Sequence, residues 1–388
     1  MSESFSLEAV VRPNILALKP YRCARDDYSS GILLDANENS LGSAVTGDYV
    51  SVAQAQALNR YPDPLHVQVK DRLVKLRNLP GPDHVFLGVG SDEVIDLLVR
   101  IFCVPGKDKI LITPPTYGMY GVTAQINDVG VVKVPLTVTE PMFQLNTAQI
   151  LETTRQDPTI KMIFVCSPGN PTGTLIDPDA IRHLLQSLDA FRGIVVVDEA
   201  YIDFVASDRG ESVASWVTQY PNLVVLQTMS KSFGLAGIRL GLGIAQPAII
   251  QLMNNTKAPY NVGTPTAAIA LAALTDEGIA KMQSSAVQLR AQRDLLLKEL
   301  PKITGVGELV GTHDANFVLC RILAKDGSGE PSSERAHAVY ERMAQQCGLV
   351  VRFRGNEPGC AGCLRITVGT PEENQKLLLL LAQTLEQL

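Results

Sequence analysis

The stretch NLVVLQTMSKSFGLAGIRLG, residues 222–241, decides the fold class of the chain. Its apolar run 223–226 does not alternate with polar residues, which is typical of a strand buried on both faces of a largely parallel sheet. The run ends abruptly in Thr228, Ser230 and Lys231, so hydroxyl groups and an amine follow directly on a buried strand. In open sheets of this kind, ligands bind beyond the carboxyl ends of the strands. The stretch therefore predicts an α/β fold with a ligand site near Lys231.

Similar apolar runs alternate with helical segments from about residue 85 onward. They are VFLG (85–88), KILIT (109–113), KMIFVC (161–166), GIVVVDEAY (193–201) and IRLGLGIA (238–245). This alternation favours a parallel sheet with helices on both faces. After about residue 275 an amphipathic helix is followed by strand-like runs and a closing helix that Thr370 caps. We therefore expect a second, smaller α+β domain in the C-terminal part.

The composition narrows the classes of partner and compartment. The net charge of -6 and the lack of a Lys/Arg run argue against a nucleic-acid partner. The N-terminus lacks the features of a signal peptide, and no apolar stretch reaches the length of a membrane span, so we expect a cytoplasmic protein without a membrane partner. Seven scattered cysteines indicate reduced thiols. Cys360 and Cys363 lack a second ligand pair and are interpreted as a turn, and we expect no metal site.

Polar residues after the other runs each allow two interpretations. Ser91, in GVGSDEV (88–94), begins a helix in a way that suits a phosphate, although this motif alone favours an ordinary capped helix. Asn170 either presents an amide at the sheet edge or simply belongs to a loop. Asp198 follows a strand too apolar for the surface, so it needs a cation or a strong donor unless it caps a helix. Glu93 and Gln246 replace the third glycine of dinucleotide fingerprints, which disfavours a nicotinamide dehydrogenase.

Lys231 connects these strand ends. A lysine at the end of a buried strand is desolvated, which lowers its pKa and makes the amine nucleophilic toward carbonyl groups, as a Schiff base requires. A lysine whose amine reaches solvent is the alternative. An anion cradle, an amide, a carboxylate and an amine nevertheless follow four separate strands, and Arg239 can grip a phosphate in bidentate fashion. Their joint occurrence favours one active site.

At these positions the chain resembles the fold-type I pyridoxal-phosphate enzymes and, within them, the histidinol-phosphate aminotransferases. SKSFGLAGIRLG (230–241) resembles their cofactor-lysine motif, and SPGNPTG (167–173) and VVVDEAY (195–201) match two further signatures. Stretches more specific to the subfamily are LDANENSLG (34–42), NRYPDP (59–64), GVGSDEVID (88–96), PPTYGMY (114–120) and CLRITVGTPEEN (363–374). The resemblance extends from about residue 12 to the C-terminus.

The resemblance implies an architecture and a cofactor. We expect a large domain (49–277) with a mostly parallel seven-stranded sheet, a small C-terminal α+β domain (278–388), and an N-terminal segment (1–48) that joins the small domain. The implied cofactor is pyridoxal 5′-phosphate, with Lys231 as the Schiff-base lysine and proton carrier and Asp198 paired with the pyridine nitrogen. Further implied cofactor contacts are Asn170 and Tyr201 to the phenolic oxygen, Tyr117 to the ring face, and Ser91, Asp92, Thr228, Ser230 and Arg239 to the phosphate.

The resemblance also implies substrates and an assembly. L-Histidinol phosphate would donate an amino group to 2-oxoglutarate, giving imidazole-acetol phosphate and L-glutamate in L-histidine biosynthesis. The implied substrate residues are Tyr21, Asn37, Arg352 and Arg365, together with Tyr61, which would reach the neighbouring subunit's substrate and cofactor in a homodimer. Strand alternation places Arg365 and Thr367 on one face, whereas Arg352 taken alone is interpreted as a surface charge. The alternative functions are an aromatic amino-acid aminotransferase and a lyase similar to threonine-phosphate decarboxylase.

Overall fold

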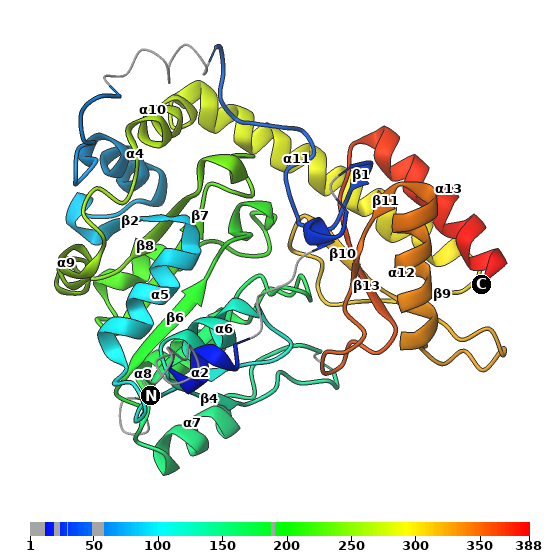
Figure 1. Ribbon diagram of the computed structural model, residues 1–388, viewed down its shortest axis with the longest axis horizontal. Helices are drawn as coiled ribbons and strands as arrows, with labels where there is room; N and C mark the ends of the chain where they lie inside the picture. Colours follow the sequence, from blue (N-terminus) through cyan, green and yellow to red (C-terminus); the bar gives the residue numbers. More distant parts are fainter. Residues whose placement is uncertain (1–11, 19–23, 29, 49–57, 141, 188–190) are drawn as a thin grey trace, which may run out of the picture.

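The computed structural model of the protein describes residues 12–18, 24–28, 30–48, 58–140, 142–187 and 191–388. Two sheets, each with its own helices, form a larger and a smaller part, and the long helix α11 (Asp276–Glu299) runs from one to the other (Figure 1). Within the described residues, none of the helices combines the length and apolar character that a bilayer crossing requires.

A seven-stranded sheet forms the centre of the larger part, in the order β2-β8-β7-β6-β5-β3-β4. The strands are β2 (Val85–Val89), β3 (Lys109–Ile112), β4 (Gly130–Lys133), β5 (Ile160–Cys166), β6 (Ile194–Asp198), β7 (Leu223–Thr228) and β8 (Leu240–Ile244). β8 runs antiparallel to β2 and β7, and all other neighbours are parallel. This confirms the predicted mostly parallel sheet of seven strands. Edge strand β4 (Gly130–Lys133) has no fully buried residue and has a neighbouring strand on one side only.

Helices cover both faces of this sheet, as the unbroken apolar runs require. They are α4 (Val67–Arg77), α5 (Gly90–Phe102), α6 (Met119–Ile126), α7 (Thr147–Gln156), α8 (Pro178–Gln186), α9 (Pro247–Thr256) and α10 (Thr264–Ala273). α5, α6 and α9 share one buried core with the strands, and α4, α7, α8 and α10 share a second core on the other face. Short elements complete the described chain: α2 (Pro13–Leu16), η1 (Ala24–Asp26), η2 (Pro82–His84), η3 (Ile202–Phe204), η4 (Ala214–Thr218), η5 (Ala236–Ile238) and η6 (Leu300–Lys302).

The smaller part is built on an antiparallel sheet with a separate core. Its strands are β12 (Arg352–Phe353), β13 (Cys363–Thr367), β10 (Phe317–Ile322) and β9 (Val306–Val310), in that order, with helices α12 (Ser333–Cys347) and α13 (Pro371–Gln387) packed together beside it (Figure 1). Thr370 and Glu373 form the predicted capping box of α13. The N-terminal strand β1 (Ile32–Leu33) pairs in parallel with β11 (Leu349–Val350). The domain limits at residues 48 and 277 stay a prediction.

Candidate active site

A cavity of about 260 Å³ lies where strand ends of the large sheet face the small sheet. Most of the residues singled out from the sequence line it: Asn37, Ser91, Asp92, Tyr117, Asn170, Asp198, Tyr201, Thr228, Ser230, Lys231, Arg239, Arg352 and Arg365. Two candidates do not. Tyr61 is 81% exposed and stacks on Tyr260, with ring centroids 4.6 Å apart. Tyr21 lies outside the described residues.

Lys231 follows β7 and projects its amine toward the N-terminal segment. The Nζ atom donates a hydrogen bond to the carbonyl oxygen of Ala36 at 2.7 Å and lies 5.8 Å from the ring centroid of Tyr201. Desolvation, together with the positive charges of Arg365 and Arg239, lowers the pKa of the amine to about 8. At neutral pH a share of this amine can therefore lose its proton, which a nucleophile requires.

Asp198 ends β6 and is only 3% exposed. Its Oδ2 accepts a hydrogen bond from the hydroxyl of Tyr120 at 2.7 Å, and its Oδ1 accepts one from the backbone N–H of Ala200 at 3.1 Å. Burial raises the pKa of this carboxyl to about 6, whereas the two hydrogen bonds act in the opposite direction. A carboxylate held this way can pair with a protonated ring nitrogen, because such a partner would offset its desolvation.

Tyr120 was missed by the sequence interpretation, although PPTYGMY contains it three residues after Tyr117. It lies on α6, is fully buried, and stacks on Phe164 with centroids 4.6 Å apart. A buried tyrosine finds a partner for its hydroxyl, and Asp198 is that partner. The sequence signal was therefore a tyrosine three residues after Tyr117, whose hydroxyl needs an acceptor once the ring is buried.

The start of α5 forms an anion cradle together with the segment after β7. Gly90 has φ +71°, a backbone conformation that favours glycine, and a Cβ atom there would lie 2.5 Å from Arg239 Nη2 and displace this end of the guanidinium. Thr228 and Ser230 bring their hydroxyl groups within 2.9 Å of each other. Glu93 turns back to accept from the N–H of Val89 and from Asn261, away from Arg239. N–H groups at the positive end of a 13-residue helix, two hydroxyls and a guanidinium suit a phosphate group.

Asp92, also at the start of α5, contacts both Arg239 and Tyr117. Its Oδ2 lies 3.4 Å from Arg239 Nη2, and its Oδ1 accepts a hydrogen bond from the hydroxyl of Tyr117 at 3.0 Å. The carboxylate thus orients the guanidinium and the aromatic ring at once. We expect its backbone N–H, rather than its side chain, to face a bound phosphate, because like charges repel.

The opposite wall is a hydrogen-bonded group of side chains and backbone carbonyls from four segments that are distant in the sequence. Arg365 is 4% exposed and donates from Nη1 to Asn170 Oδ1 at 2.6 Å and from Nη2 to the carbonyl of Asp35. Asn37 donates to the hydroxyl of Tyr201 at 3.0 Å and accepts from Thr367 at 3.1 Å. The alternation predicted for CLRITVG places the Arg365 and Thr367 side chains on this wall.

Arg352 is a second positively charged side chain on this wall, opposite Arg365. β12 and β13 pair antiparallel with Arg352 directly across from Arg365, and both residues line the cavity. Arg352 therefore lies at the cavity wall, and its role as a substrate residue stays a prediction. Two guanidinium groups on one wall suit a substrate that carries a phosphate or two carboxylates.

The cavity fits a phosphorylated aromatic aldehyde. The cradle matches a phosphate, the Lys231 amine a carbonyl carbon, and the Asp198 carboxylate a ring nitrogen. By contrast, the described part of the chain contains no group of three His, Cys, Asp or Glu side chains that could hold a metal ion. Cys360 and Cys363 are buried free thiols at the turn that leads into β13.

Comparison with known proteins gives a consistent result. A family model described as aminotransferase class I and II matches residues 29–380. The chain is 51% identical to the histidinol-phosphate aminotransferase of Schizosaccharomyces pombe, over 96% of each chain. It is 47% identical to the histidinol-phosphate aminotransferase of Saccharomyces cerevisiae, over 99% of each chain. Its fold is similar to that of the Sinorhizobium meliloti histidinol-phosphate aminotransferase in complex with pyridoxal-5′-phosphate, with a TM-score of 0.83, 20% identity and 99% coverage of both chains.

Proposed function

Because the chain belongs to the histidinol-phosphate aminotransferases, within the class I and II aminotransferase family, we propose that it transfers the amino group of L-histidinol phosphate to 2-oxoglutarate. The products are imidazole-acetol phosphate and L-glutamate, the cofactor is pyridoxal 5′-phosphate, and the reaction belongs to L-histidine biosynthesis. The observation that carries the proposal is the meeting of Lys231, Asp198 and Arg365 in one cavity beside an anion cradle.

Five of the cavity residues would each have a separate task in this reaction. Pyridoxal phosphate, when bound, supplies an electron-poor ring that accepts the electron pair left when a proton leaves the substrate carbon. Asp198 would favour the protonated ring nitrogen, and Asn170 and Tyr201 would donate to the phenolic oxygen, while Tyr117 would cover the ring face. Lys231 has a pKa of about 8 and therefore can both take up and release a proton near neutral pH.

One wall must accept two kinds of substrate, because the donor and the acceptor use the same cavity in turn. Arg352 and Arg365 face each other across β12 and β13, so a single anion can contact both. In one half-reaction the anion is a phosphate monoester, and in the other it is a carboxylate of glutamate. The Asn37 and Tyr201 pair adds uncharged hydrogen-bonding groups beside the arginines.

A single half-reaction tests the proposal. Purified holoenzyme is mixed with L-histidinol phosphate without a keto acid, and the absorbance of the bound cofactor is followed. We expect bleaching at low donor concentration and recovery on addition of 2-oxoglutarate. Bleaching by phenylalanine but not by histidinol phosphate would instead identify an aromatic amino-acid aminotransferase. Release of carbon dioxide from threonine phosphate without any keto acid would identify a lyase.

We further propose a homodimer in which Tyr61 completes the neighbouring subunit's site. Tyr61 and Tyr260 stack at the surface, 81% and 42% exposed, and Leu58 and Leu65 add exposed apolar side chains in the same part of the sequence as Tyr61. Exposed aromatic and aliphatic side chains of this kind are characteristic of subunit interfaces. The free, mostly buried cysteines support a reducing compartment, and we propose that the protein works in the cytoplasm.

Mixing two inactive variants tests the shared site. We expect Tyr61→Ala and Lys231→Ala each to lose most activity. After dissociation and reassociation together, about half of the dimers are mixed, and each mixed dimer regains one intact site, so activity returns to about one quarter of the wild-type value. Separate reassociation of each variant is the control. No recovery on mixing would place Tyr61 in its own subunit's site or outside the reaction.

Tyr120→Phe is expected to impair the reaction through Asp198. The hydrogen bond from Tyr120 favours the ionised carboxylate, so its loss raises the pKa of Asp198 above the value of about 6. We expect the acidic limb of the rate of the histidinol phosphate half-reaction to move to higher pH, and the rate at neutral pH to fall about tenfold. Tyr220→Phe is the matched control, because that hydroxyl accepts a hydrogen bond from the surface residue Gln186 at 3.2 Å, away from the cavity. An unchanged acidic limb would contradict this role of Tyr120.

A further inference from the structure

Arg354 lines the active-site cavity but has no part in the chemistry described above. It directly follows β12, and its backbone N–H donates to the carbonyl of Cys363 at 2.9 Å, which continues the pairing with β13. Alternation along an extended chain places Arg354 on the same face as Arg352, two residues earlier. Since Arg352 lies opposite Arg365, three guanidinium groups project from this small patch of sheet toward one cavity.

Glu357 holds Arg354 at the edge of the cavity. Arg354 Nη1 lies 2.9 Å from Glu357 Oε1, and the two side chains are 17% and 24% exposed. Arg354 Nε is buried and has no hydrogen-bond partner within the described residues. Burial raises the pKa of Glu357, against the attraction of Arg354, Arg365 and Arg352 in that order. Glu357 therefore orients the Nη1 end of the guanidinium, while the Arg354 side chain still lines the cavity.

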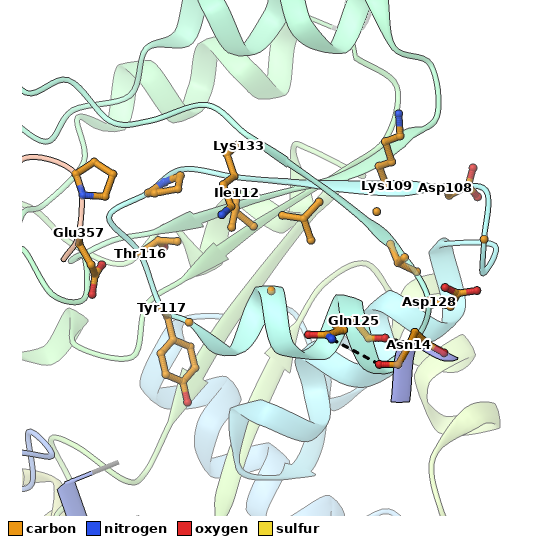
Figure 2. Close-up of a pocket in the computed structure, with 18 of the residues that line it drawn as sticks. Asn14, Asp108, Lys109, Ile112, Thr116, Tyr117, Gln125, Asp128, Lys133 and Glu357 are labelled. Atoms are coloured by element: carbon orange, nitrogen blue, oxygen red, sulfur yellow. Dashed lines mark hydrogen bonds between the residues drawn. The ribbon is translucent and has the colours of Figure 1, made fainter. Parts of the chain in front are cut away.

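The Arg354–Glu357 pair lies between the cavity and a groove on the protein surface. The groove has a volume of about 780 Å³, and Glu357 lies with Thr116 and Tyr117 at one end of it (Figure 2). Tyr117 also lines the cavity, so the two spaces adjoin at this point. Arg354 is thus placed at the mouth of the site, where a substrate's outer end would lie while its amine faces Lys231.

The charge on this wall exceeds what a single carboxylate needs. Like charges placed directly opposite each other in a sheet are destabilising, as Arg352 and Arg365 are here, unless an anion lies between them. A carboxylate has two oxygen atoms and one charge, which one guanidinium can satisfy in bidentate fashion. A phosphate monoester has three terminal oxygens and about two charges at neutral pH, so it can use a further guanidinium.

We infer that Arg354 is a specificity-determining residue that contacts the phosphate of the amino donor and selects phosphate-bearing substrates over carboxylates. The inference rests on the proposed function of the same cavity and deepens it. Glu357 acts as a positioning residue, because it holds the guanidinium in the orientation that the phosphate meets.

Arg354→Gln holoenzyme tests the assignment through a split between substrates. We expect the KM for L-histidinol phosphate to rise about tenfold or more, with kcat nearly unchanged and the KM for L-glutamate changed less than about threefold. Inorganic phosphate, used as an inhibitor of the glutamate half-reaction, should bind about tenfold more weakly. Arg354→Lys, which keeps the charge but not the fork, should fall between the two proteins. Arg155→Gln removes a similar Arg–Glu pair on α7 and serves as the control.

The outcomes separate this inference from the proposed function. Equal changes of KM for both substrates, or a loss of thermal stability without a substrate split, would assign Arg354 a merely structural role in its loop and overturn the inference. Unchanged inhibition by inorganic phosphate would also overturn it. A wild-type enzyme that does not react with histidinol phosphate would refute the proposed function. Inhibition of the glutamate half-reaction by inorganic phosphate, compared between wild type and Arg354→Gln, would still test the role of Arg354.

Discussion

Replacement of Lys231 by alanine is expected to slow both half-reactions by about 10⁴-fold or more, because we propose that this one residue supplies both the nucleophilic amine and the proton carrier. Its Nζ is the amine whose pKa the cavity lowers to about 8. The other residues proposed to hold the cofactor, from the start of α5 to Asp198, are unchanged in this variant. We therefore expect the cofactor to bind without covalent attachment, with rates measured by single-turnover absorbance in stopped flow.

A second lysine with a lowered pKa provides the control. Burial also lowers the pKa of Lys70 to about 8, but Lys70 lies on α4 and does not line the cavity. Lys70→Met should therefore leave the half-reaction rates of the folded holoenzyme close to wild type. If borohydride treatment of wild-type holoenzyme labels a lysine other than Lys231, or if Lys231→Ala turns over at the wild-type rate, the assigned role of Lys231 is wrong.

Replacement of Asp198 by asparagine is expected to lower the rate of both half-reactions by about 10² to 10³-fold. The carboxylate is the negative group that we propose to pair with the ring nitrogen, and an amide could not hold that nitrogen in its protonated state. The geometry should persist, because the asparagine side chain can still accept a hydrogen bond from Tyr120 or from the N–H of Ala200. Stopped-flow rates with saturating cofactor separate this loss from weaker cofactor binding.

The same substitution should stabilise the cofactor-free protein. The folded-state pKa of Asp198, about 6, lies above the ordinary value of 3.8, so folding penalises the charged form once the pH exceeds the lower value. The amide of the Asp198→Asn variant carries no such charge. The advantage of the variant in free energy of unfolding should grow as the pH rises from about 4 to about 6 and then stay constant at about 3 kcal/mol. Urea unfolding of both cofactor-free proteins at pH 5 and pH 8 measures this, and a larger advantage at pH 5 would contradict the assigned pKa.

The strand ends were predictable because each functional group follows directly on an apolar run. Lys231, Asp198 and Asn170 could be placed at one edge of a sheet by the rule that parallel strands end on the same side. Their partners in the small sheet, Arg352 and Arg365, needed the resemblance to known enzymes, because two arginines on short strands do not by themselves indicate where they point.

Contacts that depend on tertiary packing were not predictable. Tyr120 reaches Asp198 only because α6 packs against the face of the sheet that carries the carboxylate. Arg354 shares a face with Arg352 only because the chain continues extended beyond β12, where a loop rich in glycine and proline begins. Local sequence carries neither piece of information, since both contacts depend on which elements become neighbours.

The contacts of residues 35–37 with the C-terminal part of the chain determine when the active site can form during protein synthesis. The carbonyls of Asp35 and Ala36 accept from Arg365 and Lys231, and the backbone N–H of Asn37 donates to Thr367 at 2.9 Å. Contacts that span 330 residues form late, because loop closure must precede them. A nascent chain still attached to the ribosome can thus complete its large sheet before the cavity wall that contains Arg365 and Thr367 is formed. This part of the proposed active site can therefore form only after translation has passed Thr367.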